Sequence, residues 1–194
     1  MKIIIINYGA GNIQSIKFAI ERLGYTAILS RDVNQIREAD KVIFPGVGEA
    51  SSAMRKLRES RLDTLIPDLT QPVLGICLGM QLMCATSEEG NTTGLGIFNA
   101  HVQRFDNTVV KAPQIQWNTI NQLKTPLFNN IDEGAFIYMV HSYYAPVTPE
   151  TSAVSHYGIP YSAAFAKANF YGTQFHPEKS SSVGEQILKN FLEL

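Results

Sequence analysis

The chain has 194 residues, of which 45% are hydrophobic, and a formal net charge of -1 from 16 basic and 17 acidic residues. This length and composition suffice for one sizeable core, which predicts a single domain over residues 1–194. The balanced charge gives no electrostatic reason to expect nucleic acid or an anionic membrane as a partner. The start MKIIIINYGAGN has the pattern of neither a signal peptide nor a membrane-spanning helix, so we expect a cytoplasmic protein.

Short apolar runs alternate with amphipathic segments in the first half of the chain. The runs predict strands over 2–6, 25–30, 41–46 and 71–76. Apolar residues at helical spacing predict one helix from about residue 12 to residue 23 and another over about residues 50–57. Strands separated by helices pair in parallel through right-handed crossovers. The predicted fold class is therefore α/β, with a doubly wound, mostly parallel sheet and helices on both faces.

The sequence pattern changes after about residue 95. Short β-rich stretches separated by Gly, Pro and Asn predict several antiparallel hairpins. The stretches cover residues 97–105, 109–113, 135–145, 151–157, 161–170 and 171–176. A closing amphipathic helix is predicted from about residue 180 onward, docked on the sheet.

Cys77 stands between Gly75 and Gly79, directly after an apolar strand and directly before an apolar helix. A residue at such a strand-to-helix turn has a strained backbone and a side chain thrust out above the sheet edge, and the flanking glycines prevent collisions. The start of the following helix favours the reactive thiolate. We therefore predict that Cys77 is a nucleophile rather than a small buried hydrophobe. Cys84 is expected in the middle of the same helix as core packing.

The segment FHPEKS near the end of the chain supplies a base for that nucleophile. His176 follows a strand-like run, and His-x-Glu in an extended segment directs both side chains to one side. A thiolate needs an imidazole as its ion-pair partner and as the acid for the leaving group, and a carboxylate can orient the imidazole. These roles are predicted for His176 and Glu178. The alternative is a surface histidine in a turn.

Attack on an amide also requires N–H donors for the negatively charged oxygen that forms. Leu78, the residue after the nucleophile, is one expected donor. The segment FPGVGEA is the other, because Gly46 and Gly48 let the chain turn sharply at the end of a strand, so that Val47 or a neighbour can present its N–H. The alternative for this segment is a tight turn without a catalytic role.

Neither a cofactor nor a metal is expected. Gly9, Ala10 and Gly11 begin a dinucleotide-binding pattern, but its third glycine is replaced by Gln14. The remaining histidines, at positions 101, 141 and 156, have no regular ligand spacing.

Taken together, GICLGMQ, PGVG and FHPEKS resemble the class I glutamine amidotransferases over nearly the whole chain. The resemblance implies a flavodoxin-like fold and a Cys, His and Glu triad that hydrolyses the side-chain amide of glutamine. The stretches NYGAGNIQS, MVHSYY and FHPEKSSSVG are similar to those of one branch, the glutaminase subunits of imidazole glycerol phosphate synthases. By the same resemblance, the residues that line the glutamine pocket are Gln81, Glu89, Ser142 and Tyr143.

The resemblance also implies a partner, a (β/α)8-barrel cyclase subunit that forms a heterodimer with the chain. This partner takes ammonia through an internal channel and makes imidazole glycerol phosphate and an aminoimidazole carboxamide ribonucleotide in histidine biosynthesis. The residues similar to the partner-facing set are Asn12, Trp117, Tyr138 and Lys179. The chain departs from the family at residues 113–118, where it reads PQIQWN instead of the common P-H-x-G-W-N.

Two alternatives remain open from the sequence. The chain could be the glutaminase of another pathway, such as pyridoxal phosphate, anthranilate or purine synthesis, although NYGAGN and HSYY argue against this. It could also be an inactive scaffold that binds and regulates a barrel enzyme, although an intact Cys77, His176 and Glu178 argue against the loss of activity.

Overall fold

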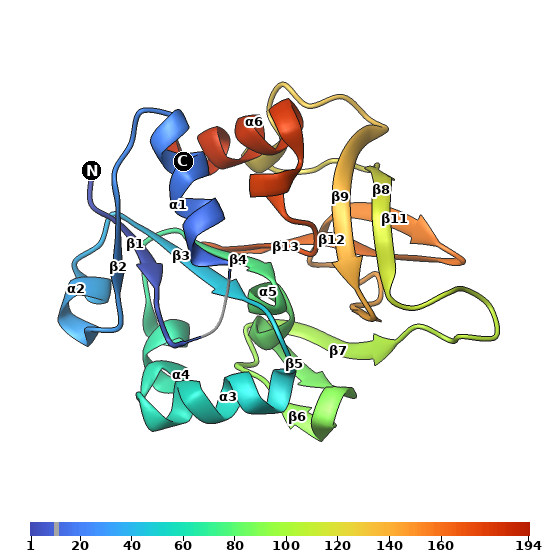
Figure 1. Cartoon of the computed structure of the whole chain (residues 1–194), viewed down its shortest axis with the longest axis horizontal. Helices are drawn as coiled ribbons and strands as arrows, with labels where there is room; N and C mark the ends of the chain where they lie inside the picture. Colours follow the sequence, from blue (N-terminus) through green and yellow to red (C-terminus); the bar gives the residue numbers. More distant parts are fainter. Residues whose placement is uncertain (10–11) are drawn as a thin grey trace.

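The structure is a computed structural model that describes residues 1–9 and 12–194 (Figure 1). Ala10 and Gly11 of the NYGAGN motif lie outside the described residues. The α-helices are α1 (Ile13–Arg22), α2 (Val33–Arg37), α3 (Ala50–Glu59), α4 (Leu62–Leu65), α5 (Leu78–Met83) and α6 (Ser181–Leu192). Short 3-10 helices are η1 (Ile66–Asp68), η2 (Glu89–Asn91), η3 (Pro126–Phe128) and η4 (Pro177–Lys179).

The strands of the first half are β1 (Ile3–Ile6), β2 (Ala27–Ser30), β3 (Lys41–Gly46), β4 (Val73–Cys77), β5 (Cys84–Ser87) and β6 (Thr92–Thr93). Those of the second half are β7 (Phe98–Arg104), β8 (Gln114–Ile120), β9 (Ala135–His141), β10 (Tyr143–Tyr144), β11 (Thr151–Tyr157), β12 (Ile159–Lys167) and β13 (Phe170–Thr173).

The main sheet has the strand order β11-β12-β13-β4-β3-β1-β2. From β2 to β13 all neighbouring strands pair in parallel. β11, β12 and β13 then form an antiparallel meander at the other edge. The predicted α/β class with a mostly parallel sheet is therefore confirmed. So are the antiparallel hairpins of the second half, which include the ribbon of β8 and β9.

Helices cover both faces of this sheet, and β1 shows why. Ile4 and Ile6 belong to a core shared with helices α2 to α5, whereas Ile3 and Ile5 belong to a second core shared with α1 and α6. Successive side chains of a strand point to opposite faces, so an unbroken apolar run fits a strand covered on both sides. In Figure 1, α1 and α6 lie above the sheet and α3 and α4 below it.

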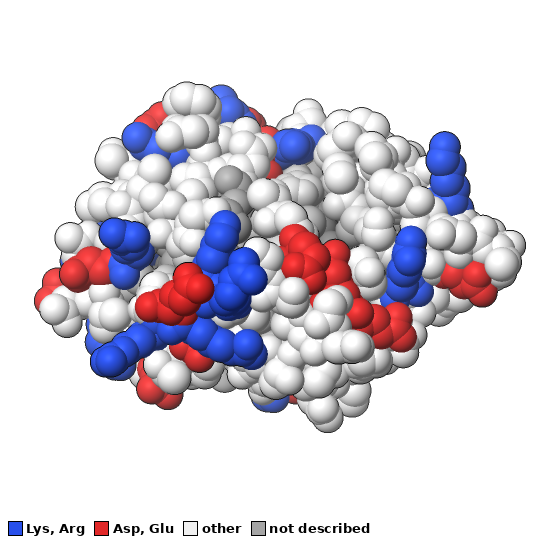
Figure 2. Space-filling model, turned by 60° about the horizontal axis from the view of Figure 1, so that its bottom comes forward, with Lys and Arg blue, Asp and Glu red and all other residues white. Residues whose placement is uncertain are grey.

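A smaller sheet with the order β10-β7-β5-β6 flanks the main one. On the face drawn in Figure 2, acidic and basic side chains are mixed and do not form a field of one sign. Within residues 1–9 and 12–194, the structure has no helix with the length and apolarity needed to span a bilayer.

The predicted strand at 109–113 is wrong, and the strand lies at 114–120 instead. Asp106 turns the chain, because its backbone oxygen accepts the N–H groups of Val109 and Val110 (both 3.0 Å) and its carboxylate accepts the N–H of Thr108 (2.8 Å). Pro113 has no N–H to donate to a ladder. Pairing therefore begins only at Gln114, opposite His141.

The predicted position of Cys84 in the middle of a helix is also wrong. Helix α5 ends at Met83, and Cys84 begins β5. The carbonyl groups of Leu82 and Met83 accept the backbone N–H groups of Leu95 and Ile97, at 2.8 and 2.9 Å, so they do not continue the helix. The expectation of core packing holds, because Cys84 is fully buried and is a free thiol.

Candidate active site

The three segments that carry the predicted triad and oxyanion residues meet because their strands are neighbours in the sheet. β4 lies between β3 and β13, and all three run parallel. Cys77 at the end of β4 pairs with Gly46 at the end of β3. Thr173, the last residue of β13, pairs with Ile76, and the chain then leads to His176. The carboxyl ends of parallel strands are where α/β sheets place their sites.

The turn at Cys77 has the strained conformation that the sequence predicts. Cys77 has φ 54° and ψ -112°, a region that residues with a side chain rarely adopt. The helix that follows packs directly on the end of β3. A Cβ atom on Gly79 would overlap the carbonyl oxygen of Phe44, and one on Gly46 would lie 2.6 Å from the backbone nitrogen of Gly79. The glycines are therefore required by close packing between backbones.

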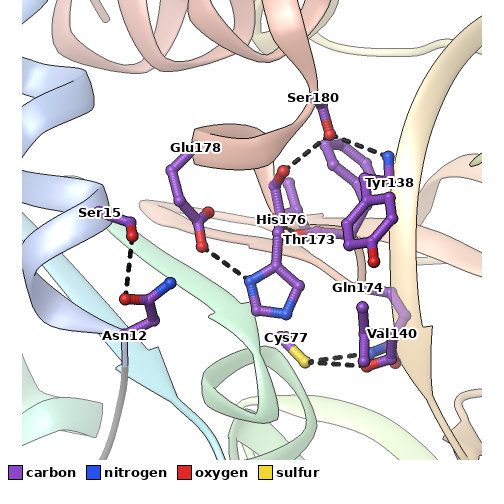
Figure 3. Close-up of polar contacts among 11 residues, drawn as sticks. Asn12, Ser15, Cys77, Tyr138, Val140, Thr173, Gln174, His176, Glu178 and Ser180 are labelled. Carbon is purple, nitrogen blue, oxygen red and sulfur yellow. Dashed lines mark hydrogen bonds and ion pairs between the residues drawn. The ribbon is translucent and has the colours of Figure 1, made fainter. Parts of the chain in front are cut away.

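The imidazole of His176 lies between a carboxylate and the sulfur of Cys77 (Figure 3). Its Nδ1 is 2.8 Å from Oε1 of Glu178, and the Glu178 side chain is fully buried. Burial lowers the pKa of His176, but hydrogen bonds with Cys77 and Glu178 outweigh it and raise the pKa to about 10. The imidazole is thus held in its protonated form, the state that pairs with a thiolate.

The backbone around this pair differs from the predicted extended segment. Residues 177–179 form the 3-10 helix η4, with Pro177 at its first turn, because proline has the φ that a helix start needs. The N–H of Lys179 donates to the His176 carbonyl at 3.0 Å. The 3-10 turn still brings Glu178 onto the imidazole.

Two further groups contact the Cys77 sulfur, and the sequence did not single out either of them. The thiol donates to the carbonyl oxygen of Val140 at 3.8 Å, and Nε2 of Gln174 donates to the sulfur at 3.9 Å (Figure 3). Gln174 is fully buried. Its position two residues before His176 is the signal that could have identified it, since alternate residues of an extended chain share a side.

A cavity of about 200 Å³ opens beside the sulfur. The structure brings together in its wall Cys77 and all four residues predicted to line the glutamine pocket, Gln81, Glu89, Ser142 and Tyr143. The rest of the wall is formed by Gly48, Pro113, Val140 and His141. A larger cavity of about 690 Å³ is lined by residues that include Asn7 and Ser60, and Cys77 is not part of its wall.

Glu89 supplies a carboxylate to this cavity. Its Oε2 accepts the backbone N–H of Ala50 at the start of α3, at 2.9 Å. Burial raises its pKa, while the hydrogen bond from Ala50 acts in the opposite direction. A cation in the cavity would offset that cost of burial.

His141 is the second imidazole at the site, and it is held neutral. Its side chain is buried, with 6% of the residue exposed, and Nδ1 lies 2.7 Å from the carbonyl oxygen of Tyr143. Burial lowers its pKa to about 4. A neutral imidazole beside a carbonyl must donate from Nδ1, which leaves Nε2 as an acceptor. Nε2 is buried and has no partner in the described part of the chain.

Of the predicted oxyanion residues, Gly46 lies opposite Cys77 in the sheet and Leu78 follows it in sequence at the start of α5. Val47 is 42% exposed, so it lies at the surface beside the site. No group of three or more His, Cys, Asp or Glu side chains within residues 1–9 and 12–194 is arranged to hold a metal ion.

Two of the predicted partner-facing residues lie in or beside η4. Lys179 lies in η4 and is exposed, and Tyr138 in β9 accepts the His176 N–H with its carbonyl, at 3.2 Å. Trp117 is 47% exposed and packs edge-on against Tyr138, with 5.8 Å between ring centroids. Asn12 precedes α1 and lies on the Glu178 side of the site in Figure 3.

Comparison with known proteins gives one family. A relative from Bacteroides fragilis, named imidazole glycerol phosphate synthase subunit HisH, is 55% identical over the whole of both chains. A Haemophilus influenzae protein of the same name is 48% identical over 100% of this chain and 98% of its own.

Two solved structures of low sequence identity are similar over nearly the whole chain. A putative GMP synthase subunit from Thermoplasma acidophilum has a TM-score of 0.77 at 20% identity, with 100% of this chain and 92% of its own covered. PurLQS from Thermotoga maritima has a TM-score of 0.74 at 15% identity, covering 99% and 97%. At such low sequence identity, the similarity of these two structures to this chain shows a common fold only. Residues 4–194 match the model of the family described as glutamine amidotransferase class-I, and the chain therefore belongs to the class I glutamine amidotransferases.

Proposed function

We propose that this chain is the glutaminase subunit of an imidazole glycerol phosphate synthase, which hydrolyses glutamine and passes the ammonia to a cyclase in histidine biosynthesis. Full-length identity of 55% to a protein of that name is the observation that carries this conclusion. The cavity beside Cys77 supports it, because its wall includes Cys77 and the carboxylate of Glu89. The pairing of His176 with Glu178 supplies the base that such a nucleophile needs. A soluble, cytoplasmic subunit fits this role.

In the proposed reaction, the Cys77 thiolate attacks the side-chain amide carbon of glutamine. The protonated His176 donates its proton to the leaving nitrogen, which departs as ammonia, and a thioester remains on Cys77. Water then attacks the thioester, with His176 accepting its proton, and glutamate is released. Glu178 keeps Nδ1 of the imidazole hydrogen-bonded, so that Nε2 faces the reacting atoms.

Stabilisation of the tetrahedral oxyanion is assigned to backbone N–H groups. Leu78 follows Cys77 at the start of α5, and the turn at Gly46 and Val47 lies at the end of β3, the strand that pairs with β4 at Cys77. Such donors typically contribute about 3–4 kcal/mol to lowering the barrier. Recognition of the free amino acid is assigned to Glu89, whose carboxylate suits the ammonium, together with Gln81, Ser142 and Tyr143.

The β8–β9 ribbon suggests how the cyclase binds. Ile115, Trp117 and Phe136 are 58%, 47% and 61% exposed, respectively. They lie on one face of the ribbon, because Ile115 pairs with Val140, Trp117 with Tyr138, and Thr119 with Phe136. An exposed aromatic and aliphatic face is typical of a protein interface. Tyr138 of this ribbon contacts the backbone of His176 and the side chain of Ser180, on either side of η4, so a barrel subunit seated on the ribbon would lie beside the proposed triad.

The test is glutamate release by the chain alone and with a barrel cyclase loaded with its nucleotide ligand. Cys77→Ala serves as the blank. Strong stimulation that vanishes in Cys77→Ala supports both the nucleophile and the coupled subunit. Activity that depends on Cys77 but is the same with and without the cyclase would retain the hydrolysis and reject the partner. Absence of any Cys77-dependent glutamate release would leave the scaffold alternative.

A further inference from the structure

We propose that Gln174 stabilises the thiolate of Cys77 through a chain of side-chain amides that ends on the backbone of β10. The inference rests on the proposed function in one respect, that Cys77 is the nucleophile. It adds a donor to the sulfur that none of the motifs contains.

The chain of hydrogen bonds has three links, all inside the protein. Nε2 of Gln81 donates to the carbonyl oxygen of Tyr143 at 2.9 Å and to Oε1 of Gln174 at 2.8 Å. Nε2 of Gln174 then lies 3.9 Å from the Cys77 sulfur. Gln174 is fully buried and Gln81 is 6% exposed, so the contact of Gln174 with the sulfur is shielded from bulk water.

These contacts fix which end of each amide faces which neighbour. The carbonyl oxygen of Tyr143 can only accept, so the Gln81 group beside it is the amide nitrogen, and the second hydrogen of this nitrogen points to Gln174. The group of Gln174 that faces Gln81 must therefore be its oxygen, which leaves its nitrogen facing the sulfur. Reversal of the Gln174 amide would bring two N–H donors together and would place an oxygen against the sulfur. The geometry therefore directs an N–H donor at Cys77.

A donor in this position acts differently on the two states of the sulfur. An N–H group stabilises an anion more than a neutral thiol. The Val140 carbonyl, at 3.8 Å, has the opposite preference, because it can accept a hydrogen only from the thiol. Gln174 therefore offsets a neighbour that would otherwise keep the proton on the sulfur. The same arrangement leaves Oε1 of Gln81, in the cavity wall, as an acceptor for substrate.

The experiment measures the rate at which iodoacetamide alkylates Cys77 as a function of pH, with the Cys77 peptide quantified by mass spectrometry. Wild type is compared with Gln174→Met, which removes the donor at similar volume, and with Gln174→Glu, which places a carboxylate beside the sulfur. Loss of the donor is expected to raise the midpoint of the alkylation rate against pH by about one pH unit, so that alkylation at pH values below the midpoint slows about tenfold. Gln174→Glu is expected to raise it further.

Gln114→Met is the matched control. Gln114 is another fully buried glutamine, and its Oε1 accepts the hydroxyl of Tyr161 at 3.0 Å. The pH midpoint of Cys77 alkylation in Gln114→Met should equal that of wild type. If replacing any buried amide had a general effect, this midpoint would shift as well. Thermal unfolding establishes which variants are folded. If Gln174→Met does not fold, Gln81→Met tests the same chain from its other end and should raise the midpoint less.

A folded Gln174→Met or Gln81→Met protein with the wild-type midpoint would overturn the inference. An equal shift in Gln114→Met would overturn it as well. Alkylation needs no glutamine and no cyclase. The alkylation experiment therefore tests the contact between Gln174 and Cys77 even if the proposed function is wrong. A protein that releases no glutamate but shows the shift would retain the thiolate contact and lose the proposed reaction.

Discussion

Acid should destabilise this protein through His141. The pKa of the buried imidazole is lowered from 6.5 to about 4, whereas the imidazole of the unfolded chain keeps its ordinary value. Between these pH values the unfolded chain binds a proton that the folded chain does not bind. Stability from this group is therefore present above pH 6.5 and is lost as the pH falls toward 4.

The pKa difference sets the size of the effect. At about 1.4 kcal/mol for each pH unit, the free energy of unfolding contributed by His141 falls by up to about 3 kcal/mol between pH 6.5 and pH 4. His176 has a separate window. Its folded pKa is raised to about 10, so its contribution is complete below pH 6.5 and is lost only as the pH rises toward 10. Acidification from neutral pH therefore separates the contribution of His141 from that of His176.

The assay is urea unfolding of wild type and His141→Asn at pH 7 and pH 4.5. Asparagine can retain a donor to the Tyr143 carbonyl but does not titrate. The wild type should lose about 2–3 kcal/mol more than the variant over this interval. Carboxylates such as Glu89 titrate in both proteins and cancel in the comparison. Parallel loss of stability in the two proteins would refute the neutral, buried state of His141.

Three further outcomes follow from the site and its surroundings. Glu178→Gln keeps an oxygen available to Nδ1 but removes the negative charge, so the pKa of His176 should fall below about 10 in an NMR titration, and an unchanged pKa would contradict the assigned pairing. Gly79→Ala should lower the free energy of unfolding by about 3 kcal/mol or more in urea, because the new methyl group meets the backbone of β3; wild-type stability would show that the helix can move away. Trp117→Ala should weaken binding to the cyclase by about 2 kcal/mol in calorimetry, a rise in Kd of roughly 30-fold, while Ile28→Ala on the opposite edge strand β2 should leave it unchanged. Equal weakening by both substitutions would place the interface elsewhere.

The central strands were predictable because burial on both faces leaves unbroken apolar runs in the sequence. β3 occupies residues 41–46, the predicted range. β8 was not predictable in this way, since its polarity is inverted. Gln114 is fully buried, whereas Ile115 and Trp117 face outward. Helix α2 was missed for another reason: it has five residues, of which only Ile36 is buried, too few to show a helical period.

Some residues of the site could be predicted from the sequence and others could not. Cys77 and His176 lie in short motifs whose spacing reflects local geometry, so sequence alone could single them out. The contribution of Gln174 depends on β13 pairing with β4, a long-range feature that no local pattern encodes. The neutral state of His141 depends on burial and on the Tyr143 carbonyl, and a histidine in a strand looks the same whether it is buried or exposed.

The neighbouring positions of β4 and β13 have a consequence for synthesis of the chain. Cys77 and Gln174 are 97 residues apart, so a ribosome adding about 5–20 residues per second completes the first strand roughly 5–20 s before the second emerges. During that interval β4 has an open edge on the side that β13 later covers, and Cys77 lacks its proposed partner His176. Nascent chains should therefore be inert toward glutamine and most exposed to aggregation at the same stage, and insertion of β13 should end both conditions in a single step.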